Sequence, residues 1–198
     1  MKVDRTGVRS GRVLRLLILI LSNAFIVAEA ADPKLVICVD NGPDPLVVLQ
    51  AQAIAAQIFS RIGVGTKWYG YHGSCPVRRD KPIVIGMVSP VGDDDHPAAL
   101  AYALPFERAH IAIFYSRVQR AVDPRKVPNL LAHVLVHEIT HIIQATGQHS
   151  ESGMMKARWD ADDYFQMGRS PLEFTEEDLQ LIRIGLLAWT KKQNPEQR

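Results

Sequence analysis

Residues 128–149 read PNLLAHVLVHEITHIIQATGQH, and the interpretation of the whole chain depends on them. Their apolar members recur at helical spacing, and Pro124 and Pro128 stand where a helix commonly begins. The helix is expected to run to about Thr146, where Gly147 can adopt the left-handed conformation that closes a helix. The sequence therefore predicts a buried helix that carries several histidines.

Two of these histidines have the spacing of metal ligands. Residues four apart on a helix lie about 40° apart in projection and one turn along the axis, so the imidazoles of His137 and His141 can bind one ion. Glu138 is rotated by about 100° from His137, so its carboxylate flanks the ion as a general base would. Imidazole ligands in a tetrahedral site suit Zn²⁺, which in catalytic sites usually has three protein ligands.

The third ligand is expected to be His149, because a turn at Gly147 would bring the following segment back under the metal. His133 is also four residues from His137, but three imidazoles on one helix extend over about 12 Å, so His133 is expected either to pack in the core or to support the ligands without binding the ion. The rival carboxylates stand at the start of the last predicted helix, where they also suit the helix N-terminus: Glu173, Glu176 and Glu177. Three other acids, at 160, 162 and 163, are candidates for orienting the ligands.

Strand-like and helix-like segments alternate around this helix. Short apolar runs predict strands at 34–40, 64–71, 82–88 and 110–118, and a weaker edge strand at 98–105. Helical spacing predicts a helix over 46–62, and a capping-box-like start at Thr175 predicts a last helix that ends near residue 191.

The first thirty residues have the pattern of a signal peptide. Basic residues up to Arg15 precede an apolar core of about 13 residues, which is too short to span a bilayer comfortably. The core ends in Ala28-Glu29-Ala30, a site for signal peptidase before Ala31. We expect residues 1–30 to be removed and residues 31–198 to form one catalytic domain, secreted or periplasmic and without stable membrane insertion. An uncleaved membrane anchor is the alternative.

Composition narrows the classes of function. The chain is 47% hydrophobic and 22% charged, which is typical of a globular domain and unlike a disordered or collagenous chain. Residues 31–198 hold 18 basic and 19 acidic groups, so charge gives no reason to expect nucleic acid as a partner. After export, Cys38 and Cys75 can form a single disulfide, and two buried thiols are the alternative.

The motifs around the first histidine pair resemble those of a known clan. They follow one another as His137-Glu138-x-x-His141, Gly147, His149 and Gly153-Met154-Met155. This order is similar to that of the metzincin zinc metallopeptidases, in which H-E-x-x-H-x-x-G-x-x-H precedes a methionine turn. Here the third histidine comes two residues later and the glycine three residues later. Small exported bacterial proteins with a stretched motif are more similar, and His149-Ser150 and Lys156 match their pattern.

The resemblance implies an α+β fold: a single metzincin-like domain with a twisted, mostly parallel small sheet, an active-site helix and a C-terminal helix. It also implies a zinc metalloendopeptidase in which Glu138 is the base, and Met155, with Met154 as the alternative, is the turn methionine. A peptide or protein substrate would pair with a sheet edge near 98–105, and the protein is expected to be a monomer. The competing interpretation is a non-catalytic, zinc-stabilised interaction domain of the cell envelope.

Overall fold

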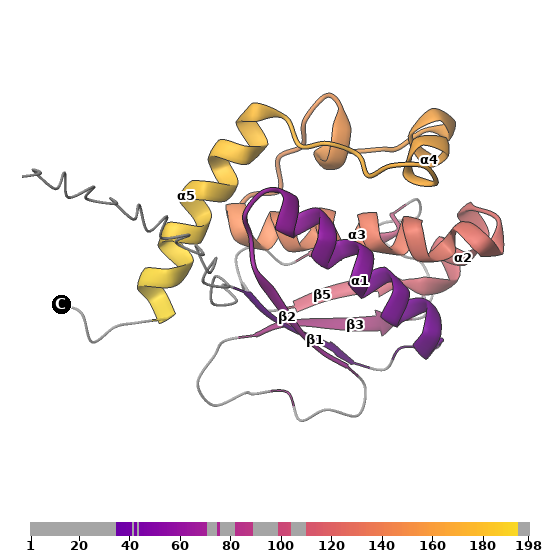
Figure 1. The fold of residues 1–198 in the computed structure, drawn as a ribbon, viewed down its shortest axis with the longest axis horizontal. Helices are drawn as coiled ribbons and strands as arrows, with labels where there is room; N and C mark the ends of the chain where they lie inside the picture. Colours follow the sequence, from indigo (N-terminus) through magenta and orange to yellow (C-terminus); the bar gives the residue numbers. More distant parts are fainter. Residues whose placement is uncertain are drawn as a thin grey trace, which may run out of the picture. The chain divides into compact units, whose positions relative to one another are not determined.

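The computed structural model describes residues 35–40, 42, 44–70, 75, 82–88, 99–103 and 110–193. All of them belong to the unit formed by residues 31–198, so the expected signal peptide lies outside the described residues. Within the described part, five strands form one sheet in the order β2-β1-β3-β5-β4. Figure 1 labels β1, β2, β3 and β5. The strands are β1 (Leu35–Asp40), β2 (Thr66–Tyr69), β3 (Ile83–Val88), β4 (Ala101–Ala103) and β5 (His110–Phe114). The helices are α1 (Pro45–Arg61), α2 (Tyr115–Ala121), α3 (Val127–Gln144), α4 (Ala161–Met167) and α5 (Glu176–Gln193), with short 3₁₀ turns η1 (Pro124–Lys126) and η2 (Gly153–Met155).

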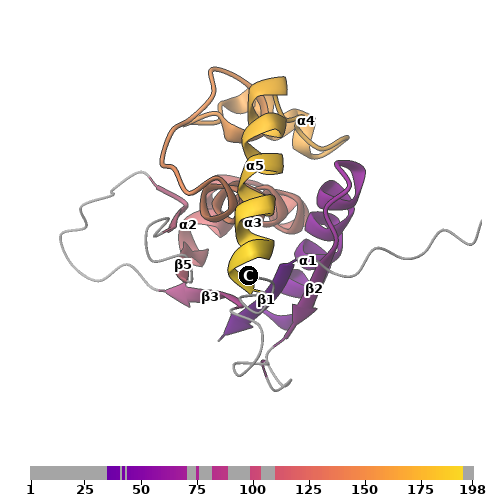
Figure 2. The ribbon, with the colours of Figure 1, turned by 90° about the vertical axis from the view of Figure 1, so that its left-hand side faces the viewer.

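The sheet is mostly parallel, and one of its faces forms the core. β1 pairs in parallel with β2 and β3, β3 pairs in parallel with β5, and the edge strand β4 runs antiparallel to β5. Fully buried residues face each other across the strands, as Ile37 does with Ile83. In both views of the ribbon, α1 and α3 lie on the same side of this sheet (Figures 1 and 2). The chain therefore has the α+β, single-domain architecture that was expected.

Helix α1 begins and ends with local signals that the sequence provides. The Asp44 carboxylate accepts a hydrogen bond from the Val47 N–H at 3.2 Å, and a proline fills the first helical position. Gly63, with φ of 74°, follows the helix in the left-handed region that glycine favours. Ala51 and Ala55 are completely buried, and their small side chains let α1 approach its neighbours closely.

Helix α3 is buried on all sides, and every residue from 130 to 143 is inaccessible to solvent or nearly so. The sheet and α1 cover one side of it, and the C-terminal segment with α4 lies on the side away from the sheet (Figures 1 and 2). Apolar residues occupy most of this buried stretch, as is typical of a helix inside a domain. This position fixes the polar side chains that α3 carries inside the domain.

Two expectations about elements were wrong. The strand expected at 110–118 ends at Phe114, and α2 begins at Tyr115. Tyr115 and Val118, three residues apart, are both buried, so the apolar run changes there from strand to helix without any break in its hydrophobicity. The sequence also missed α4, which begins at a reciprocal capping box between Asp160 and Asp163.

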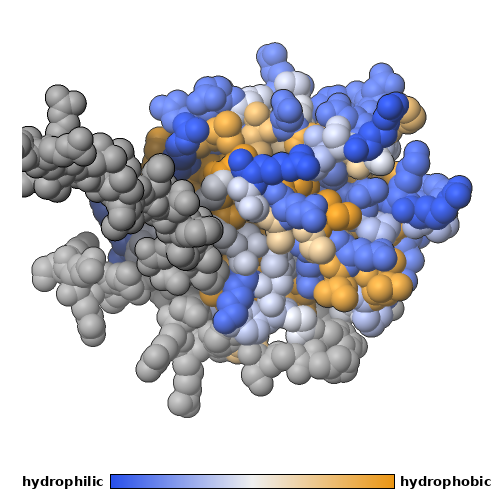
Figure 3. Space-filling model, in the orientation of Figure 1, coloured by the Kyte–Doolittle hydropathy of each residue, from blue (hydrophilic) through white to orange (hydrophobic). Residues whose placement is uncertain are grey.

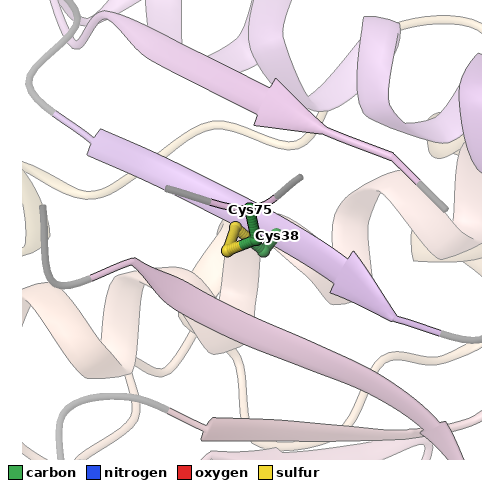
Figure 4. The surroundings of a disulfide bond; sticks show 2 residues. All are labelled: Cys38 and Cys75. Atoms are coloured by element: carbon green, nitrogen blue, oxygen red, sulfur yellow. A yellow bond between two sulfur atoms is a disulfide. The ribbon is translucent and has the colours of Figure 1, made fainter. Parts of the chain in front are cut away.

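The two cysteines are joined. Cys38 of β1 and Cys75 form a disulfide with a Cα–Cα distance of 5.9 Å (Figure 4). Leu35, Ile37 and Val39 are buried in the core, and because side chains alternate along a strand, Cys38 points to the other face of the sheet.

None of the helices in the described part of the chain combines the length and the hydrophobicity needed to cross a bilayer. On the face that carries α1, hydrophobic side chains form separate patches between hydrophilic ones (Figure 3). Leu46 and Leu49 of α1 are the most exposed apolar residues at the start of this helix.

Candidate metal centre

Helix α3 and the segment after it bring three imidazoles together. His137 and His141 are buried on successive turns of α3, and His149 reaches them from the returning chain. One nitrogen from each of the three rings lies within 4.8 Å of the others. Among the described residues, this is the cluster of potential ligands that can hold a metal ion.

The turn that returns the chain is made by an alanine. Helix α3 ends at Gln144, and Ala145 adopts the left-handed conformation with φ of 53° and ψ of 40°. The N–H groups of Ala145 and Thr146 both bond to the carbonyl of His141, which closes the helix. The role expected for Gly147 was therefore wrong: this glycine does not have a positive φ, and nothing lies within 4 Å of the Cβ position on it.

The tautomers of the two helical histidines follow from their partners. His137 Nδ1 lies 2.8 Å from the Met154 carbonyl and His141 Nδ1 lies 2.9 Å from the Thr146 carbonyl. A carbonyl can only accept, so each Nδ1–H donates and each Nε2 keeps a lone pair. These two Nε2 atoms face each other at 3.0 Å. Two lone pairs at this distance repel each other, and a cation between them would remove the repulsion.

Burial keeps these ligands neutral. Burial, and after it the neighbouring imidazoles, lower the pKa of His137 to about 3 and that of His141 to about 4. Burial also lowers the pKa of His149. A metal ion needs the neutral imidazole as ligand, so the donor set fits a borderline ion such as Zn²⁺ without a prior loss of protons near neutral pH.

Glu138 lies beside the cluster and against the edge strand. Its side chain is buried, and the burial raises its pKa to about 8, although a hydrogen bond from the Ala103 N–H of β4 favours the charged form. A dication in the imidazole cluster would favour the carboxylate. The protonation state of the Glu138 carboxyl would therefore depend on whether a metal ion is bound in the imidazole cluster.

A tight turn beneath the cluster belongs to η2. Gly153, with φ of 74°, begins it, and a Cβ at this position would lie 2.3 Å from the Glu173 carbonyl oxygen. Met154 and Met155 are both completely buried. Met154 supplies the carbonyl that orients His137, so the place expected for Met155 at the methionine turn belongs to Met154.

The competing ligands have other partners. His133 donates from Nδ1 to the Asn129 carbonyl at 2.7 Å and accepts from the Leu172 N–H at Nε2, at 3.1 Å, so it serves packing as expected. The rival carboxylates are exposed and stand outside the imidazole cluster: Glu173, Glu176 and Glu177. Asp160 and Asp163, expected as candidates for orienting the ligands, instead bind Lys156 at 2.6 Å each and cap α4.

A cleft of about 430 Å³ opens in front of the three imidazoles. Residues 99–103, which include β4, form one part of its lining. Residues 156–159 and Tyr164 form another, and Glu138 contributes to the lining with the histidines. An extended chain placed in this cleft would therefore lie beside both the edge strand and the metal cluster.

Sequence reasoning missed one buried acid near the site. Asp178 of α5 is only 3% exposed and accepts a hydrogen bond from the Ser150 hydroxyl, next to His149. A signal was present, because Asp178 falls in register with the buried Ile182 and Leu186 on the apolar side of the last helix. An acid in that register requires a partner inside the protein.

The sheet and its helices form an archaemetzincin-like fold, which brings together the H-E-x-x-H helix, the third histidine and the Met154 turn. No protein-family model and no curated protein matches the sequence. Among solved structures, the fold matches that of archaemetzincin from Methanopyrus kandleri with a TM-score of 0.54 and 14% sequence identity. The match covers 79% of this chain and 98% of the archaemetzincin chain.

Proposed function

We propose that this protein is a zinc metallopeptidase that hydrolyses peptide bonds, with Glu138 as general base. The observation that carries the proposal is the arrangement of the two facing Nε2 atoms, 3.0 Å apart, with a third imidazole and a buried carboxylate beside them. Zinc held by His137, His141 and His149 would supply a Lewis acid and a water of lowered pKa.

The other steps of the proposed reaction depend on side chains and main-chain groups of the protein. Glu138 takes up the proton of the attacking water and returns it to the leaving amine, which needs a carboxylate with a pKa near the working pH. The Met154 and Thr146 carbonyls hold the rings of His137 and His141 so that both Nε2 atoms face the ion. β4 is an edge strand in the described sheet, and an extended peptide can pair with such an edge.

The competing proposal is a zinc-stabilised domain without catalytic activity. Glu138 argues against it, because a site that only binds metal has no need of a buried carboxylate whose charged form burial disfavours. An open cleft beside the ligands also favours a catalytic site, since structural zinc sites are closed.

Purified protein provides the test. We expect one zinc per chain and cleavage of a mixed peptide library that stops when a chelator is added. The Glu138→Gln variant should keep its zinc and lose cleavage, because only the base is removed. Bound zinc without chelator-sensitive cleavage would support the competing domain, and cleavage by the Gln variant would rule out Glu138 as the base.

Ligand identity needs a separate comparison. His149→Ala should lose most of its zinc at a fixed concentration of chelator, and Glu177→Ala, an exposed position on α5, should keep it. Zinc retention in the His149 variant would remove this residue from the ligand set.

We also propose that residues 1–30 direct export and that the mature protein works as a monomer outside the cytoplasm. The disulfide between Cys38 and Cys75 supports export, because such bonds persist in oxidising compartments. The expected result is a protein in the periplasm or medium whose first residue is Ala31. Recovery of the uncut chain from the cytoplasm, with free thiols, would contradict the proposal.

A further inference from the structure

The buried carboxylate of Asp178 has more contacts than a helix start requires. It stands in the first turn of α5, where one of its oxygens, Oδ2, accepts from the Thr175 N–H at 2.9 Å and the Thr175 hydroxyl at 2.7 Å. The Asp178 N–H in turn donates to the Thr175 hydroxyl oxygen at 3.2 Å. These bonds form a reciprocal cap and account for one of the two carboxylate oxygens.

The other oxygen connects α5 to the metal cluster. Oδ1 of Asp178 accepts from the Ser150 hydroxyl at 2.6 Å, although the two residues lie 28 positions apart. Ser150 directly follows His149, and its N–H donates to the Met155 carbonyl at 2.9 Å. Asp178 is thus bonded to the segment that joins the third ligand to the methionine turn.

The end of α3 is attached at the same point. The Gln144 side-chain amide donates to the main-chain carbonyl of Asp178 at 3.3 Å. One residue of α5 therefore holds both the last residue of the active-site helix and the chain that returns from it.

His149 depends on this attachment more than the other ligands do. The rings of His137 and His141 are each oriented by a carbonyl. Within the part of the chain that the structure describes, the His149 ring is in contact with these two rings but has no hydrogen bond of its own. The exposed ring of His149 is therefore placed by its main chain, which Ser150 fixes.

We propose that Asp178 is a positioning residue of the metal site, holding His149 in place through Ser150 and adding a negative charge close to the ion. This inference rests on the metal binding of the proposed function, but not on hydrolysis. A buried negative charge near the bound dication would raise the affinity of the site.

Three variants separate positioning from helix stability. Ser150→Ala breaks the link and keeps the charge, and Asp178→Asn removes the charge and keeps the size of the side chain. Thr175→Val is the matched control, because it removes the two hydrogen bonds between the Thr175 hydroxyl and Asp178 and leaves Ser150 in place. The measurements are the zinc dissociation constant by chelator competition, the visible spectrum of the Co²⁺-loaded protein, and thermal unfolding without metal.

We expect Ser150→Ala and Asp178→Asn each to weaken zinc binding by about 10- to 100-fold and to alter the Co²⁺ spectrum. Thr175→Val should lower the unfolding temperature of the metal-free protein and leave zinc affinity and spectrum as in the wild type. Wild-type affinity in Ser150→Ala, or equal weakening by Thr175→Val, would overturn the positioning role while the zinc site itself stands. A wild-type protein that binds no zinc would overturn both this inference and the proposed function.

Discussion

The burial of Glu138 makes the folding stability of the metal-free protein depend on pH, in a direction that follows from the raised pKa. The pKa of Glu138 is raised to about 8 from 4.5, so the folded state holds a proton that the unfolded chain releases. The contribution of Glu138 to stability is fully present below about pH 4.5 and is lost as the pH rises through about 8. His137 and His141, whose pKa values are lowered, act in the opposite sense: their contribution is complete above about pH 6.5 and is lost as the pH falls towards about 4 and 3.

The prediction concerns the alkaline side of this profile. In the presence of chelator, the unfolding temperature of the wild type should fall between about pH 6.5 and 8, and that of Glu138→Gln should fall much less, because glutamine cannot ionise. Both proteins should lose stability on the acid side, where the histidines titrate. Thermal unfolding across this range measures the effect, and parallel curves for the two proteins would show that Glu138 is not a proton-binding group of the folded state.

How far individual residues could be predicted depends on the range of the interaction. His137, Glu138 and His141 share one helix, so their spacing alone places them on neighbouring turns. His149 can reach the other two histidines only if the chain turns back after α3. The sequence indicated His149 correctly, but it placed the turn at Gly147 and not at Ala145. Asp178 is bonded to Ser150, which lies 28 positions away, and no local sequence pattern predicts a contact of this range.

At the scale of elements, the end of α3 gives a test with different expected outcomes at two nearby positions. A non-glycine residue in the left-handed region costs about 1 kcal/mol, and Ala145 is such a residue. Ala145→Gly should therefore increase the free energy of unfolding by up to about 1 kcal/mol. Gly147→Ala should leave it nearly unchanged, because the glycine has no positive φ and no close neighbour. Urea unfolding distinguishes the two; a loss of stability in Gly147→Ala alone would place the helix-closing turn at Gly147 after all.

The contact between α3 and α5 depends on one glycine. A Cβ at Gly185 would lie 2.1 Å from the Ile143 carbonyl oxygen, so the two helices would have to separate. We expect Gly185→Ala to lower the free energy of unfolding by about 2–3 kcal/mol, and to weaken zinc binding because α5 carries Asp178. The neighbouring exposed Ile184→Ala serves as the control and should change little. Wild-type stability in Gly185→Ala would mean that the helices are less closely packed than the structure shows.

Elements were predictable where a periodic pattern had a clear boundary. The apolar strands and the capped helices α1 and α5 have such boundaries, and the structure contains them within a few residues of the expected positions. The change from β5 to α2 has none, because both elements present buried apolar residues and no glycine or proline separates them. Only the packing of Tyr115 and Val118 against the core decides that the chain becomes helical there.

At the scale of the whole domain, the disulfide and the imidazole cluster lie on different sides of the sheet. Cys38 points away from the core face, which is covered by helix α3 with its imidazole cluster (Figures 1 and 4). The bridge closes a loop with a sequence separation of 37 that contains α1 and β2. Removing such a constraint from the unfolded chain costs about 4 kcal/mol in the chain-entropy account, and observed losses are commonly 2–5 kcal/mol.

The double variant Cys38→Ser/Cys75→Ser should therefore lower the free energy of unfolding by about 2–4 kcal/mol. Its zinc affinity at a temperature where it remains folded should equal that of the wild type, because Cys38 points to the face of the sheet opposite α3. Denaturant unfolding and chelator competition measure the two quantities separately, and the wild type in reductant should behave like the variant. Unfolding that is indifferent to reductant would show that the bridge does not restrain the unfolded chain, and a loss of zinc affinity in the folded variant would show that the two faces of the sheet are coupled.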